Sequence, residues 1–261
     1  MSTSMDSGVG ADEESELDSL VAEEVAAESY RSPEGSAEGS AVDDTGATEP
    51  AAAGAAPTVE SRLDLAQELI AAGDHLGAQA VYREVLVASP ANLEARLGLA
   101  RLFESQGQHV QALEQLEAAR EVDPDNVVVL TQLGTVLGAL GKFQDAERDL
   151  KRAQRLAPER AAPYQILGVL YFKRGLYAQA EQELARALEQ DATLAAAYYY
   201  RGEALHQLDR FDEALEMLMR AVDLDPKNAR AYHTMGIIYD RKHLRAEAAE
   251  MYRRGREANA S

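Results

Sequence analysis

Histidines are the first residues to test for chemistry, because imidazole serves both as a metal ligand and as a general acid or base. The chain has five histidines. A metal site can be drawn from His206 and His233, with Glu203 or Asp240 as a further ligand. The two histidines fall at different heights along their predicted helices, and no HExxH motif is present. The sequence therefore predicts no metal site and no catalytic residue here.

Phosphate-binding and nucleophilic motifs are the next candidates. The run GTVLGALGKF at residues 134–143 lacks the GxxxxGK[ST] spacing, and Phe143 stands where a hydroxyl would hold Mg²⁺. No GxSxG, dinucleotide-binding or kinase signature occurs, and the absence of cysteine removes thiolate zinc sites and a cysteine nucleophile. We expect a protein that is not an enzyme and needs no cofactor.

Net charge bears on the class of partner. The chain carries 26 basic and 45 acidic residues, for a net charge of −19. A chain this acidic repels phosphate, which argues against nucleic acid despite a basic cluster near the C-terminus. No window approaches the roughly 18 apolar residues of a membrane span, and the N-terminal stretch MSTSMDSGVGADEE resembles no targeting peptide. We expect a cytoplasmic protein without direct membrane insertion. The basic cluster is Arg241, Lys242, Arg245, Arg253, Arg254 and Arg256.

Residues 1–58 form an acidic tail rich in Ala, Ser and Gly. The tail holds 14 acidic residues against the single base Arg31, and such a composition predicts disorder. Within it, Leu17, Leu20, Val21 and Val25 fall at helical spacing. This stretch is either a short helix that folds onto a partner or onto the protein's own groove, or a transient helix in a solubilising tail. A separate hypothesis is that the tail folds back onto the basic cluster.

Residues 59–261 repeat with a period of 34. One position is always alanine, another always Gly or Ala, and large apolar residues recur at fixed offsets, which predicts two antiparallel helices per repeat. Gly73, Gly107, Gly141 and Gly175 mark the turns, and Asn92, Asn126 and Asn228 are placed to cap first helices. We expect repeats at 59–92, 93–126, 127–160, 161–194, 195–228 and 229–261. The invariant alanines are Ala78, Ala112, Ala146, Ala180, Ala214 and Ala248, and the small residues are Ala66, Ala100, Gly134, Gly168, Gly202 and Gly236.

No repeat can cover its own apolar face, so the repeats must stack. The expected fold is all-α, a right-handed α-solenoid with a concave side, preceded by the disordered tail. Leu65, Leu99, Leu133 and Leu167 are predicted core residues of the first helices, and Arg201 replaces the leucine in the fifth repeat. That substitution predicts looser packing there.

These residues resemble the tetratricopeptide repeat (TPR) family. The fourth repeat matches best, and the resemblance covers about residues 59–258, although the usual Trp is absent. TPR proteins usually end with an extra solvating helix, which is missing here, so a homo-oligomer through the uncapped C-terminal repeat is possible. The matching residues of the fourth repeat are Tyr164, Leu167, Gly168, Tyr171, Ala180 and Leu184.

The resemblance implies that ligands lie in the concave groove made by the first helices. Tyr199 and Tyr200 flank a predicted core residue, Tyr198, and we expect both to be exposed as binding hot spots. The predicted partner is one or more protein segments, extended or helical, with apolar anchors. The partner-binding candidates are Gln165, Val169, Phe172, Tyr199, Tyr200, Glu203, His206, His233 and Ile237.

A non-enzymatic scaffold or adaptor is therefore the function that we expect. The alternative is a regulatory or client-holding, chaperone-like subunit of an enzyme or secretion complex. Repeat positions encode packing, so the sequence does not identify the partner or pathway.

Overall fold

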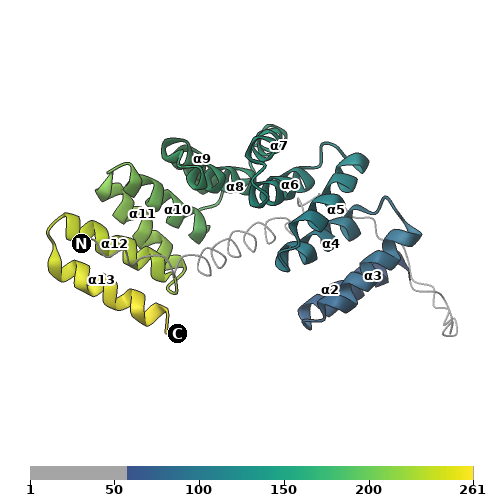
Figure 1. Cartoon of the computed structure of the whole chain (residues 1–261), viewed down its shortest axis with the longest axis horizontal. Coiled ribbons are helices and arrows are strands. Elements are labelled where there is room, and N and C mark those ends of the chain that lie inside the picture. Colours follow the sequence, from purple (N-terminus) through teal and green to yellow (C-terminus); the bar gives the residue numbers. More distant parts are fainter. Residues whose placement is uncertain (1–57, 261) are drawn as a thin grey trace, which may run out of the picture. The chain divides into compact units, whose positions relative to one another are not determined.

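The computed structural model describes residues 58–260, and within them it contains twelve α-helices arranged as six consecutive pairs (Figure 1). The predictions for the acidic tail, both its disorder and the short helix around residues 17–25, lie outside the described residues. The first helices of the pairs are α2 (Val59–Ala71), α4 (Leu93–Ser105), α6 (Val127–Ala139), α8 (Ala161–Lys173), α10 (Ala195–Gln207) and α12 (Ala229–Arg241). The second helices are α3 (His75–Ala88), α5 (His109–Val122), α7 (Phe143–Leu156), α9 (Tyr177–Gln190), α11 (Phe211–Leu224) and α13 (Arg245–Ala258).

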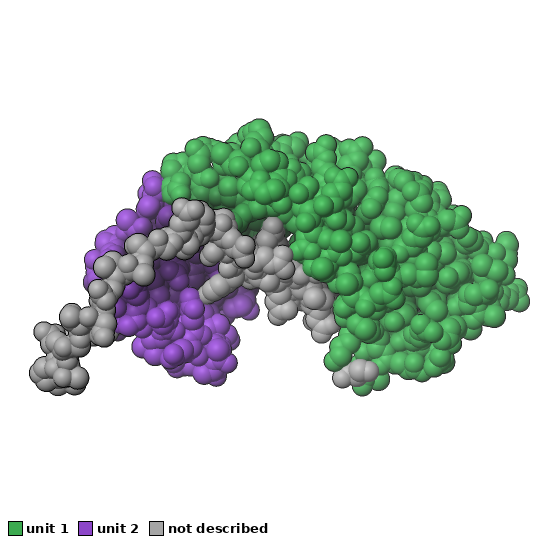
Figure 2. Space-filling view, turned by 180° about the vertical axis from the view of Figure 1, so that it is seen from behind, with its two compact units in different colours: residues 1–28, 123–261 green, residues 29–122 purple. Residues whose placement is uncertain are grey.

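The described helices fall into two compact units, coloured separately in Figure 2. Helices α2–α5 lie in unit 2, and helices α6–α13 lie in unit 1. Each first helix packs mainly against the second helix of its own repeat. Each first helix also begins at the residue where the 34-residue period starts a repeat. The all-α repeat architecture expected from the sequence is thus confirmed.

Close approach between the two helices of a repeat depends on the small residue of the first helix. A Cβ added to Gly168 would stand 2.5 Å from Cγ of Leu184, and one added to Gly134 would stand 2.4 Å from Cγ of Leu150. Gly202 meets Leu218 in the same way, at 2.7 Å. The leucine side chain therefore occupies the space above the glycine, and this contact sets how closely the helices pack.

The turns within the pairs have the backbone that the sequence predicts. Gly73, Gly107, Gly141 and Gly175 adopt φ between 69° and 78°. Asp209 and His243 occupy the same place in the last two repeats, with φ of 59° and 61°. A side chain is strained in this left-handed region, so these two turns are less favourable than the four glycine turns.

Asparagine side chains begin three of the first helices, as expected. Asn92 accepts a hydrogen bond from the Ala95 amide at 2.8 Å, and Asn228 accepts one from the Ala231 amide at 3.0 Å. Asn126 accepts from the amides of Val128 and Val129. Each cap satisfies amide donors that have no partner inside the helix.

Two core predictions need correction. Leu65 is 44% exposed, because its side of α2 faces away from the following repeat and no other described helix covers it. Arg201 does not loosen the fifth repeat in the manner expected. Its guanidinium is half-buried, lies 2.8 Å from a Glu181 carboxylate oxygen on the preceding α9, and also approaches the Met217 sulfur. The leucine is replaced by an ion pair that joins two repeats.

Replacing Gly168 by alanine tests the close contact between paired helices. We expect Gly168→Ala to lower the free energy of unfolding by about 1–2 kcal/mol, because overpacking outweighs the helix propensity that alanine gains. In the double variant with Leu184→Ala, the total loss should be smaller than the sum of the two single losses. Urea denaturation of the four proteins measures this coupling. Simple additivity would contradict the proposed contact.

The last turn offers a stabilising substitution. His243→Gly should raise the free energy of unfolding by about 0.5–1 kcal/mol, because glycine relieves the strain of positive φ at some cost in unfolded-chain entropy. The matched opposite change, Gly175→Ala, should lower it by about 1–2 kcal/mol. Urea denaturation measures both variants, and we expect the midpoint to rise for His243→Gly and to fall for Gly175→Ala. Shifts of the same sign would show that backbone strain does not control the stability of these turns.

Candidate functional site

The first helices of unit 1 line its inner side (Figure 1). Helix α8 contacts both α6 and α10, and α10 contacts α12, whereas no two second helices of this unit pack together to a similar extent. A stack whose first helices are closer together than its second helices curves toward the first helices. The concave side of unit 1 is therefore formed by α6, α8, α10 and α12.

Helical geometry identifies the residues on this side. Gln165 and Val169 lie about half a turn around α8 from the core residue Leu167. The positions 34 residues before and after them lie on the same side of the neighbouring helices. We call the following set the groove face: Thr131 and Thr135 on α6, Gln165, Val169 and Phe172 on α8, Tyr199, Tyr200, Glu203 and His206 on α10, and His233 and Ile237 on α12.

The exposed pair of tyrosines predicted from the sequence is not found. Tyr199 and Tyr200 are 4% and 5% exposed, while the expected core residue Tyr198 is half-buried. The rings of Tyr199 and Tyr200 are 5.1 Å apart, and the Tyr200 ring meets that of Phe172 edge-on at 5.4 Å. Three consecutive tyrosines on a helix cannot all face the core. Here Tyr198, the predicted core residue, is the most exposed of the three.

These rings form a cluster that joins α8 and α10. Phe172 also contacts Tyr177 at the start of α9, with 5.5 Å between ring centroids. Edge-on contacts between aromatic rings add to the free energy gained by burying them. Val169 is buried beside Phe172 on the same face of α8. The middle of the groove face is consequently aromatic and aliphatic.

Several polar atoms on or beside the groove face have unused hydrogen-bonding capacity. The Oε1 atoms of Gln132 and Glu203 and both ring nitrogens of His206 are buried and accept or donate no hydrogen bond. Buried polar groups nearly always find partners, so atoms of this kind are suited to hydrogen bonds with a ligand. The family resemblance implies groove positions for Gln132, Glu203 and His206 alike.

The structure does not bring the histidines together as a metal site. The His206 ring packs near Phe211 at 6.0 Å, whereas the His233 ring packs near Tyr252 at 5.5 Å. Asp240 accepts a hydrogen bond from the Tyr252 hydroxyl at 2.9 Å. Among residues 58–260 there is no group of three His, Cys, Asp or Glu side chains that could hold a metal ion.

Two titratable side chains of the groove face, Glu203 and His206, are shifted toward their neutral forms. Burial raises the pKa of Glu203, although the Thr234 hydroxyl and the Arg230 charge both oppose the shift. Burial also lowers the pKa of His206, and the charge of Arg241 lowers it further, against a smaller opposing effect of Asp209. Both shifts have the same cause, because a buried site disfavours charge of either sign. Glu203 and His206 therefore place little charge on this side of unit 1.

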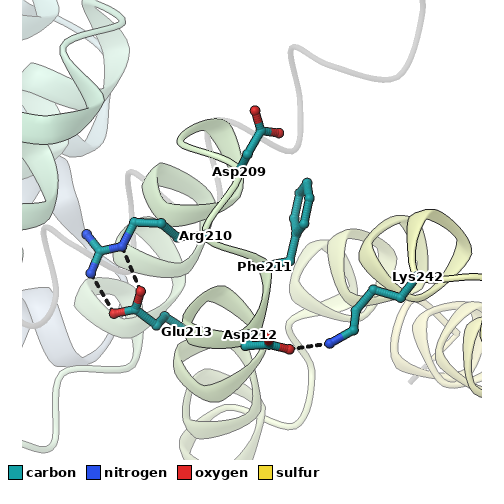
Figure 3. A pocket seen from close by; sticks show the side chains of 6 residues that line it. All are labelled: Asp209, Arg210, Phe211, Asp212, Glu213 and Lys242. Carbon is teal, nitrogen blue, oxygen red and sulfur yellow. Dashed lines mark hydrogen bonds and ion pairs between the residues drawn. The ribbon is translucent and has the colours of Figure 1, made fainter.

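A small pocket of about 240 Å³ lies at the turn between α10 and α11 (Figure 3). Its charges are already paired: Arg210 holds Glu213 at 2.7 Å, and Lys242 contacts Asp212. The remaining carboxylate, Asp209, pairs with Arg241 at 3.4 Å. With every charge matched, this pocket offers no group to activate a substrate. It is lined by Asp209, Arg210, Phe211, Asp212, Glu213 and Lys242.

The basic cluster near the C-terminus is largely neutralised by nearby carboxylates. Besides the pairs of Arg241 and Lys242, Arg253 contacts both Glu250 and Glu257, and Arg254 contacts Glu250. These pairs hold the pKa of the Glu250 carboxyl at about 2. A surface with paired charges gives little attraction for phosphates or for an acidic tail. The hypothesis that the tail folds onto this cluster concerns residues outside the described part of the chain and stays a hypothesis.

Comparisons with known proteins agree with this architecture. Three family models described as tetratricopeptide repeat match residues 69–133, 131–195 and 195–228. No curated protein matches the sequence significantly. In the part of the chain from residue 58 to residue 260, no helix is both long and apolar enough to span a bilayer.

Similar solved structures include three TPR-like chains. The crystal structure of MamA is 28% identical over 62% of this chain and 95% of its own, with a TM-score of 0.56. The Cut9–Hcn1 structure of the APC/C is 18% identical over 78% of this chain and 40% of its own, with a TM-score of 0.70. YrrB, described as a TPR protein with an unusual peptide-binding site, is 22% identical over 69% of this chain and 93% of its own, with a TM-score of 0.55.

A half-buried carboxyl group in unit 2 gives a pH-dependent test. Burial raises the pKa of Glu104 from 4.5 to about 7, against the opposing charge of Arg101. The unfolded chain therefore releases this proton at lower pH than the folded chain, so stability falls as pH rises from about 4.5 to 7. Glu104→Gln should remove that decline and make the protein more stable at pH 8, by on the order of 1–3 kcal/mol.

Urea denaturation between pH 4.5 and 8 measures the effect. Glu114→Gln is the matched control, because Glu114 is exposed on α5 and its replacement removes the same charge without changing a buried site. An equal pH slope in the two variants would show that Glu104 is ionised throughout this range.

Proposed function

Because the chain belongs to the tetratricopeptide repeat family, we propose that it is a non-enzymatic scaffold that binds a partner protein on the groove face of unit 1. The partner contributes an extended or helical segment with apolar anchors. We place this interaction in the cytoplasm, with no nucleic acid, cofactor or bilayer involved. The repeats of this family typically act as protein-interaction modules.

The observation that carries the proposal is the aromatic and neutral middle of the groove face. Phe172, Tyr199 and Tyr200 form an apolar wall across two neighbouring repeats, and Val169 extends it along α8. Tyrosine is among the residue types enriched at binding hot spots. Gln132 and Glu203 provide the acceptor atoms that can fix the register of a bound backbone.

Chemistry other than binding has little support in the described residues. The pocket at Asp209 has paired charges, and the histidines of the groove contact different second helices. YrrB, which is similar in fold, carries a peptide-binding site, and this supports the use of a TPR groove for peptide recognition.

Charged substitutions on the groove face test the function. Phe172→Glu combined with Ile237→Glu adds charge at two half-buried positions of α8 and α12. We expect this variant to lose its partners by at least about tenfold, because it introduces ions where apolar anchors must be desolvated. Affinity purification from the native cell, compared with the unchanged protein by quantitative mass spectrometry, measures the loss.

The matched control is Leu156→Glu combined with Met219→Glu, at positions 45% and 42% exposed on the second helices α7 and α11. Circular dichroism checks that both variants fold. Partners retained by the groove variant, or lost equally in both, would contradict binding at this face. A set of many unfolded proteins, held stoichiometrically, would instead favour the client-holding alternative.

A further inference from the structure

The exposed fraction of the side chains varies along the groove face. The position occupied by Thr131, Gln165 and Tyr199 in three successive repeats is 4%, 1% and 4% exposed. The same position in the last repeat, His233, is exposed. Helix α8 is buried on every side from Ala161 to Tyr171. Three neighbouring repeats therefore bury this position, whereas the last repeat leaves it open.

The inaccessible part of the groove has a definite length. It covers three neighbouring helices, α6, α8 and α10. Packed helices lie about 8–10 Å apart, so the axes of α6 and α10 are separated by roughly 16–20 Å. A helix of 13 residues is about 20 Å long. One short helix laid across the first helices therefore matches the size of this surface.

The chain itself contains a segment of that length and chemistry. Residues 16–28 read ELDSLVAEEVAAE, with Leu17, Leu20, Val21 and Val25 at helical spacing. On the other side of such a helix, Glu16, Ser19 and Glu23 would remain in water. Aliphatic anchors suit the aromatic wall of Phe172, Tyr199 and Tyr200.

Attachment in the same chain makes even weak binding effective. Residues 29–57 join the segment to the repeats and are rich in Ala, Gly, Ser and Pro. A random coil of 29 residues would have a root-mean-square span of about 30 Å. Short flexible linkers give effective concentrations in the millimolar range, so an affinity that is negligible between separate molecules suffices within one.

We propose that residues 16–28 bind as an amphipathic helix to the groove face across α6, α8 and α10, so that a partner must displace them. The proposal rests on the proposed function, because it assigns the same groove an internal competitor. The Oε1 atoms of Gln132 and Glu203 are buried without a hydrogen-bond partner, and an occupant that supplies donors would satisfy them.

Paramagnetic labelling of the full-length protein tests the proposal. The chain has no cysteine, so Ser19→Cys introduces a single site for a spin label on the water-facing side of the segment. We expect amide signals of α8 and α10 to broaden strongly and those of α13 to stay sharp. Leu20→Asp combined with Val21→Asp should abolish the broadening, whereas Glu16→Gln combined with Glu23→Gln should preserve it.

A mixture of two labelled proteins shows whether the bound segment comes from the same chain or from a second copy. Spin-labelled protein without nitrogen-15 is mixed with nitrogen-15 protein without the label. Broadening confined to molecules that carry their own label supports the proposal. Broadening in the mixed sample would mean that a second copy supplies the segment, and no broadening in either sample would mean that the segment does not bind; both results overturn the proposal.

A binding measurement separates this proposal from the proposed function. The probe is a fluorescent synthetic peptide of residues 16–28, titrated into full-length proteins. The Leu20→Asp, Val21→Asp chain should bind the peptide at least tenfold more tightly than the unchanged chain, since its own segment no longer competes. Equal binding overturns internal competition while leaving partner capture by the groove untouched. Partner capture by the Phe172→Glu, Ile237→Glu variant is a separate measurement, because its result does not depend on whether the tail binds the groove.

Discussion

Contact between a small residue on the first helix and a leucine on the second is the constraint on which this structure depends. In the third, fourth and fifth repeats a glycine lies directly beneath the leucine side chain, and a single added carbon would stand within 2.7 Å of it. Such a contact fixes the separation of the paired helices. Because it recurs at intervals of 34 residues, each repeat presents the same shape to the next, and stacking follows without long-range connections.

Regular stacking also explains where variation is tolerated. Positions that face the paired helix or the neighbouring repeat are restricted to apolar or small residues, and Arg201 is accepted only with an ion pair to Glu181. Positions on the inner side of the first helices carry no such restriction. They hold threonine in one repeat, glutamine in the next and tyrosine in the third. Recognition can therefore change from protein to protein while the fold is retained.

The sequence predicts the fold well, because the features that determine it are local and repeated. Turn glycines, asparagine caps and the helix starts all follow from the 34-residue period. The side chains of the groove were predicted less well. The order of exposure among Tyr198, Tyr199 and Tyr200 depends on Phe172 in the neighbouring repeat, whose ring packs edge-on against Tyr200. Leu65 shows the same limitation, because a core position is buried only where another element covers it.

Neutrality of the groove has consequences for selectivity. The chain as a whole is strongly acidic, so long-range electrostatics favour basic partners during encounter. The middle of the groove face opposes that preference, because burial shifts both Glu203 and His206 toward their uncharged forms. A charged ligand group there would lose its hydration in a site that disfavours charge of either sign. Under the proposed function, the partner segment that satisfies both long-range attraction and local fit is one in which basic residues flank a short run of apolar anchors.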